Sequence, residues 1–181
     1  MSLRKGYHGD VVLFVSPDLP DEVKNLCESY NIRTEHMPTD QTSVKGARYV
    51  GYTRVCSSYE WCFATDFRDA FFQADPFASI PDGYDLILAQ EDPSTPIKDC
   101  PFNSGWIKTC WSEDFLNEIG DNLPLCSGTI MGTSAGFDAL TIAMLSEMDK
   151  TSTVEGCHEM DGFDQGHFNY LYYSDSLKNV K

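Results

Sequence analysis

Short apolar runs alternate along this chain with segments of helical spacing, and this alternation restricts its fold more than any other feature. Apolar and β-branched residues predict strands over residues 11–15, 31–37, 84–89 and 125–132. Apolar residues three and four positions apart predict helices over residues 21–30, 45–58, 136–147 and 164–173. Loops are expected over residues 93–102 and 150–156. Strands alternating with helices predict an α/β fold, with a mostly parallel central sheet flanked by helices.

Length and charge narrow the class of protein. The chain has 181 residues, which favours a single small domain over residues 1–181, either complete or one domain of a longer protein. Its net charge of −15 would repel a phosphate backbone and an anionic membrane surface, so no nucleic-acid partner is expected. No apolar run approaches the roughly 20 residues of a membrane helix, so no membrane span is expected.

The cysteines bear on the cellular compartment. There are seven, an odd number, and no two are spaced as C-x-x-C. This pattern argues against a zinc site and against a secreted disulfide framework. Residues 1–10 also lack the apolar core of a signal peptide. We therefore expect free thiols and a cytoplasmic protein.

An acidic segment over residues 63–77 contains the main candidate metal-binding residues. A short apolar strand ends at Asp66 and Asp69, and a turn at Asp75–Pro76 follows. Ligands of open α/β sheets bind at the carboxyl ends of strands. Two carboxylates at such a position suit a hard divalent cation that also contacts phosphate oxygens. The alternative is a strand and turn with solvated acids near a sheet edge.

This segment, Asp-x-Arg-Asp followed by Phe-Gln-x-Asp-Pro-Phe, resembles the metal-binding motif of GT-A glycosyltransferases. Within that class it is similar to the small glycosyltransferase domains of chlorella-virus enzymes that decorate capsid proteins. The resemblance implies a GT-A (Rossmann-like) fold that holds Mn²⁺ or Mg²⁺ and a nucleotide-sugar donor such as a UDP-sugar. It further implies sugar transfer, with retention favoured, to a glycan or glycoprotein acceptor. A viral member would act in the host cytoplasm, with a capsid glycan as a candidate acceptor.

The same resemblance assigns roles within the acidic segment. Asp69 matches the last aspartate of the motif and is the expected direct metal ligand. Asp66 is the second candidate ligand and a catalytic candidate; the alternative is that it holds the ribose or a metal-bound water. Arg68, between them, is a candidate for contacting a donor phosphate, and a structural ion pair is the alternative.

Further donor contacts are expected outside the acidic segment. Ser16 follows the first predicted strand, where GT-A enzymes seat the base and ribose. Arg48 and Tyr52 lie one helical turn apart and are candidates for the diphosphate or base, with a surface arginine and a half-buried tyrosine as the alternative. Ser127 and Gly128 resemble a stretch that lines the sugar pocket, because small residues let a ligand approach the backbone. The alternative for that stretch is a glycine-bounded core strand.

The last predicted helix carries a third group of candidates. Asp164 and Gln165 resemble the Asp-Gln helix of GT-A families, in which the acid faces the sugar or acceptor. Asp164 is also placed to cap the helix N-terminus. His167 lies one turn later on the same face and is a candidate metal ligand, with a satisfied or exposed histidine as the alternative.

Two other functional classes stay open. Paired acids at strand ends would also serve a metal-dependent phosphohydrolase or nucleotidyltransferase, although the chain lacks a Gly-rich phosphate loop followed by Lys. A non-catalytic acidic module could instead bind carbohydrate or protein through Trp61, Trp106 and Trp111. Manganese-dependent release of nucleoside diphosphate from a nucleotide sugar would separate these classes.

Overall fold

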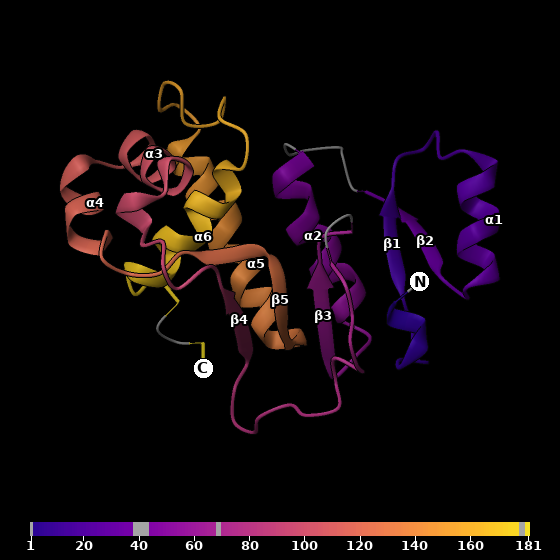
Figure 1. Ribbon diagram of the computed structural model, residues 1–181. Helices are drawn as coiled ribbons and strands as arrows, with labels where there is room; N and C mark the ends of the chain where they lie inside the picture. The colour runs from indigo at the N-terminus through magenta and orange to yellow at the C-terminus, as the bar shows by residue number, and fades with distance from the viewer. Residues whose placement is uncertain (1, 38–43, 68–69, 178–179) are drawn as a thin grey trace.

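The computed structural model describes residues 2–37, 44–67, 70–177 and 180–181, which form a mixed α/β fold (Figure 1). Arg68 and Asp69, two of the predicted site residues, lie outside the described residues. The strands are β1 Val12–Val15, β2 Arg33–His36, β3 Trp61–Thr65, β4 Leu86–Gln90 and β5 Leu125–Thr133. The helices are η1 Leu3–Lys5, α1 Asp21–Ser29, α2 Val44–Cys56, η2 Ile97–Asp99, α3 Pro101–Cys110, α4 Glu113–Ile119, α5 Ser134–Thr151 and α6 Phe163–Tyr173.

The strands form two sheets rather than one mostly parallel sheet. β1 and β2 pair in parallel, with Val12 opposite Arg33 and Val15 opposite His36. β5 lies between β3 and β4 and is antiparallel to both. Among the described strands, the only parallel pairing is therefore that of β1 with β2, and the predicted mostly parallel central sheet is not observed.

The path of the chain between β4 and β5 explains the antiparallel pairing. A crossover helix would carry the chain back across the sheet, so that the next strand starts at the opposite edge. Here α3 and α4 intervene, but the chain returns to the edge it left, because Leu125 at the start of β5 pairs with Gln90 at the end of β4. β5 therefore runs back along β4.

This topology brings three strand ends to one edge of the sheet. Since β3 and β4 are both antiparallel to β5, they run in the same direction; β3 ends opposite Thr129 in the middle of β5, and β4 ends opposite Leu125 at its start. The Asp66 N–H donates to the Gly128 carbonyl at 2.8 Å, and the Glu91 N–H donates to the Pro124 carbonyl at 2.9 Å. Acidic residues thus follow β3 and β4 on either side of the first residues of β5.

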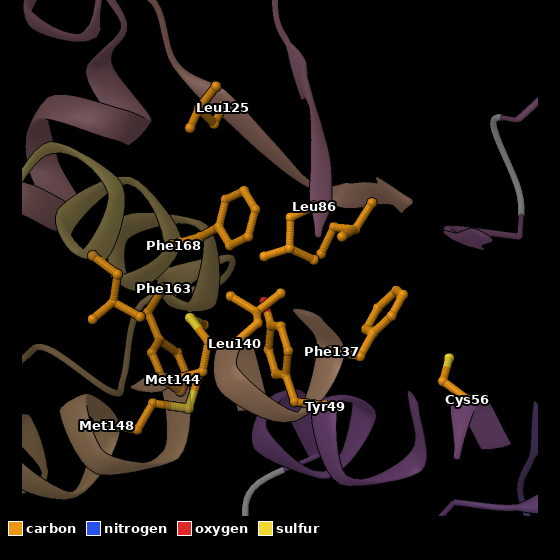
Figure 2. Packing of buried hydrophobic residues seen from close by; sticks show 12 residues of the cluster. Tyr49, Cys56, Leu86, Leu125, Phe137, Leu140, Met144, Met148, Phe163 and Phe168 are labelled. Carbon is orange, nitrogen blue, oxygen red and sulfur yellow. The ribbon is translucent and has the colours of Figure 1, made fainter. Parts of the chain in front are cut away.

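The main core lies where α2, α5 and α6 meet the three-stranded sheet. Figure 2 shows Tyr49 of α2, Phe137 and Leu140 of α5, Phe168 of α6 and Leu86 of β4 converging. The first four of these are fully buried. Figure 1 shows β1, β2 and α1 at the opposite end of the molecule from α3 and α4.

The region between β4 and β5 is more helical than predicted. Residues 93–102 were expected to be a loop, but η2 lies within them and α3 begins at Pro101. Proline at the first position of a helix needs no N–H and has a suitable φ, so Pro101 begins a helix rather than preventing one. Ser112 then caps α4 by accepting from the Phe115 N–H at 3.0 Å. α5 also extends to Thr151, into the second predicted loop.

The prediction that the cysteines are free thiols is wrong for four of the seven. Cys56 at the end of α2 is bonded to Cys62 in β3, and Cys110 at the end of α3 is bonded to Cys157. The free cysteines are Cys27, Cys100 and Cys126. The second bridge joins positions 47 residues apart, which only the tertiary fold brings together. Among the described helices, none has the length and apolar character that crossing a membrane would need.

Candidate functional site

A cavity of about 520 Å³ opens beside the sheet edge where β3 ends. It is lined by Met37, Lys45, Arg48, Asp66, Phe102, Trp106, Ser127, Asp161, Gly162, Asp164 and Gln165. Five of the predicted site residues, from four separate elements, therefore face one space: Arg48, Asp66, Ser127, Asp164 and Gln165.

Arg48 is the centre of this arrangement. Its Nη1 donates to Asp164 Oδ2 at 2.9 Å, and its Nη2 donates to Asp66 Oδ1. One guanidinium thus joins a carboxylate from the end of β3 to one from the first turn of α6. Burial opposes the charge on Arg48, but Tyr52, Asp164, Tyr49 and Asp66 outweigh it and raise the pKa of Arg48. The surface-arginine alternative is therefore not what the structure has.

Asp66 is held against the backbone of β5. Its N–H donates to the Gly128 carbonyl, and its carboxylate lies directly over the Gly128 Cα. A Cβ added at Gly128 would lie 2.7 Å from Asp66 Cγ, closer than side-chain carbons approach. From the sequence, Gly128 was expected to let a ligand approach the backbone. In the structure, the Asp66 carboxylate occupies the space that a side chain at position 128 would fill. The Asp66 side chain remains 47% exposed, so its carboxylate is still accessible from the cavity.

Asp164 does not cap α6. The helix begins at Phe163, and its N-cap is Gly162, which has a φ of 76° and makes no side-chain cap hydrogen bond. Asp164 is in the first turn, where a carboxylate is favoured by the helix dipole. Its side chain is 5% exposed and points to Arg48. The capping interpretation is therefore wrong, and the Asp164 carboxylate is paired with Arg48 of α2.

Gln165 is fixed by a polar network that reaches three other parts of the chain. Its Nε2 donates to Glu91 Oε1 at 2.9 Å and to Asn103 Oδ1 at 3.3 Å, and its Oε1 accepts from the Ser127 N–H at 3.3 Å. The amide orientation is therefore determined by its partners. The network ties the residue after β4, the helix α3 and the start of β5 to α6.

Aromatic side chains from α3 form one wall of the cavity. The rings of Phe102 and Trp106 have centroids 6.1 Å apart, and Phe102 is 70% exposed. The Trp106 indole donates to the Asp161 carbonyl at 2.9 Å. Gly162 and Gly166 pack against the Trp106 side chain, since a Cβ at either would approach it to 2.6 Å.

Several members of this site were missed from the sequence. Glu91 lies two residues after the strand predicted over residues 84–89, and that position was the available signal. Asn103 and Phe102 lie in or beside a segment predicted as loop, so no helix face was assigned to them. Lys45 forms an ion pair with Asp161 at 2.7 Å. The two residues are 116 positions apart in the sequence, so no local sequence pattern indicates the pair.

Other predicted residues lie elsewhere. Tyr52 lines a neighbouring cavity of about 370 Å³ between β1 and β3, which shares Met37, Arg48 and Asp66 with the first. Ser16 is exposed and is not among the residues that line these two cavities.

His167 is not part of the cavity either. It is fully buried, with Nδ1 2.9 Å from the Phe163 carbonyl and Nε2 2.6 Å from Thr151 Oγ1. Burial lowers its pKa, and both ring nitrogens have protein partners. The structure therefore does not bring His167 together with Asp66, and the satisfied-histidine alternative describes it.

Comparisons of this chain with protein-family models, with curated proteins and with solved structures found no match.

Proposed function

We propose that this chain is a metal-dependent glycosyltransferase that moves a sugar from a nucleotide-diphosphate sugar, such as a UDP-sugar, to a glycan or glycoprotein acceptor. The observation that carries the proposal is the Arg48 bridge between Asp66 and Asp164 at the 520 Å³ cavity. Two carboxylates that were separately expected to face metal and sugar meet at one charged group. The finer GT-A assignment of the fold belongs to the same proposal.

The charges of the cavity suit a divalent cation. Three carboxylates line it, those of Asp66, Asp161 and Asp164, against the two cations Lys45 and Arg48. Asp66, with its half-exposed carboxylate, and Asp69 would hold Mn²⁺ or Mg²⁺. The bound ion would stabilise charge on the leaving diphosphate as a Lewis acid.

The remaining residues bind and orient the sugar. Gln165 lines the cavity, is held by its hydrogen bond to Glu91, and presents an amide group that matches sugar hydroxyls. Asp164 faces the sugar or acceptor, with its carboxylate paired to Arg48. The exposed ring of Phe102 offers an apolar surface to the C–H face of a sugar ring. A few directed polar groups beside an aromatic wall are typical of small-molecule sites.

The test is nucleotide release from UDP-sugars in the presence and absence of manganese. We expect manganese-dependent release of UDP, and we expect Asp66→Asn or Asp69→Asn to lower it by about 10²-fold or more while the fold survives. Asp138→Asn is the matched control, because Asp138 is exposed on α5 and does not line the cavity.

The other functional classes give different results in the same assay. A phosphohydrolase would release phosphate from simple phosphate esters and show no preference for nucleotide sugars. A binding module would raise its melting temperature with a sugar but turn nothing over. Normal donor turnover by both Asp66→Asn and Asp69→Asn would overturn the assignment of the acidic motif.

A further inference from the structure

A second cluster of metal-ligating side chains lies outside the cavity, between the end of α3, the segment after α5 and α6. Cys110, Cys157 and His167 each offer one ligand atom, and these atoms lie within 4.8 Å of one another. All three residues are buried. Within the described part of the chain this is the only such group of three or more His, Cys, Asp or Glu residues. The two cysteines form a disulfide with an S–S distance of 2.03 Å.

The histidines around this disulfide are arranged as ligands. The Phe163 carbonyl can only accept, so His167 Nδ1, 2.9 Å away, carries the proton and Nε2 keeps its lone pair. Metal-binding histidines are commonly fixed in this way, with the second nitrogen donating to a backbone carbonyl. His158 Nε2 lies 3.0 Å from Thr151 Oγ1, the same hydroxyl that His167 Nε2 approaches to 2.6 Å. Two imidazole nitrogens therefore converge on the Thr151 hydroxyl, and the ligand nitrogen of His167 also lies within 4.8 Å of both cysteine sulfurs.

We infer that reduction of the Cys110–Cys157 disulfide creates a zinc site, with the two thiolates, His167 and His158 as its four ligands. Two thiolates and two imidazoles are a donor set that tetrahedral Zn²⁺ prefers. The Thr151 hydroxyl can turn to the Glu147 carbonyl at 3.0 Å, so releasing the imidazoles leaves it satisfied.

The redox step balances with a dithiol reductant. The reductant gives two electrons and two protons to the Cys110–Cys157 bond and becomes a disulfide itself. The two thiols then lose their protons as they bind the metal. Disulfide and zinc are alternative links at the same place, so each redox state keeps α3 tied to the segment that precedes α6. Trp106 of α3 and Asp161 of that segment both line the cavity, and either link would maintain their relative positions.

The experiment uses cobalt as a spectroscopic probe for zinc. The purified protein is reduced with a phosphine, transferred to anaerobic buffer and titrated with Co²⁺, and parallel samples stay oxidised. We expect the reduced protein to bind an equimolar amount of Co²⁺, with thiolate-to-cobalt charge-transfer absorption and the visible bands of a tetrahedral ion. Added Zn²⁺ should displace the cobalt. The oxidised protein should show neither signal.

The second disulfide supplies the matched control. Cys56 and Cys62 also become a pair of thiols on reduction, but they are not part of the Cys/His group. Cys56→Ser with Cys62→Ser should therefore keep the cobalt spectrum, whereas Cys110→Ser with Cys157→Ser should lose it. His158→Ala changes a less buried residue and should weaken binding at least tenfold. Absence of the spectrum from the reduced wild type, or its persistence in the Cys110/Cys157 variant, would overturn the inference.

Discussion

Replacing Arg48 by methionine tests the central feature of the site. Methionine keeps much of the apolar stem of arginine and removes the guanidinium that serves both Asp66 and Asp164. The two carboxylates differ in burial: the Asp164 side chain is 5% exposed and that of Asp66 is 47% exposed. The structure therefore predicts that the loss of the Asp164 ion pair lowers the free energy of unfolding more than the loss of the Asp66 ion pair.

The magnitude follows from that difference. Leaving a buried charge without its partner costs about 3–5 kcal/mol, whereas an exposed ion pair contributes about 0–1 kcal/mol. We expect Arg48→Met to lower the free energy of unfolding by about 3–5 kcal/mol, almost all of it through Asp164. For a chain of this length, about 2–4 °C of melting temperature is lost per kcal/mol.

A double-mutant cycle measures the coupling. Urea denaturation of Arg48→Met, Asp164→Asn and the double variant gives the three free energies that are needed. In the double variant the neutral amide no longer needs a cation, so most of the loss should be recovered. Asp66→Asn in the same background should recover little. A loss below about 1 kcal/mol for Arg48→Met, or no recovery in the double variant, would refute the argument that Arg48 balances a buried Asp164.

Three further predictions concern single side chains. Gly128→Ala should push the Asp66 carboxylate away from Arg48, and should therefore lower both turnover of a UDP-sugar and manganese binding. The control is Gly105→Ala in α3, where an added Cβ meets open space; it should instead stabilise the fold by roughly 0.5–1 kcal/mol. Tyr49→Phe should raise the unfolding free energy by about 1 kcal/mol, because the buried Tyr49 hydroxyl has no hydrogen-bond partner among the described residues; a loss of stability would reveal such a partner. Burial lowers the pKa of His158 and His167 below 6.5, so the unfolded chain takes up protons that the folded chain does not. The contribution of these histidines to the free energy of unfolding should be complete above about pH 6.5 and decline as the pH falls below it. Thermal melts of His158→Ala should show a shallower decline.

The sequence by itself determined most of the strands and helices and part of the candidate site. Continuous apolar runs and helical spacing located β1, β4, β5, α1, α2 and α6 to within a few residues, because these patterns record which side chains face the core. Asp66, Ser127 and Gly128 were found for a related reason: acids and small residues at strand ends are local features. α3 and α4 were missed, because their only strong signals, Pro101 and Ser112, also occur in loops.

The tertiary structure decided how these pieces meet. The direction of β5 depends on the edge of the sheet at which the chain arrives after α3 and α4. No property of residues 125–133 themselves encodes that direction. The role of Asp164 depends on Arg48, which is 116 residues away, and the Cys110–Cys157 bond depends on a contact across 47 residues. Periodicity describes one element at a time. Ion pairs, disulfides and the convergence of Gln165 with Glu91 are set only when packing of the core fixes the distances between elements.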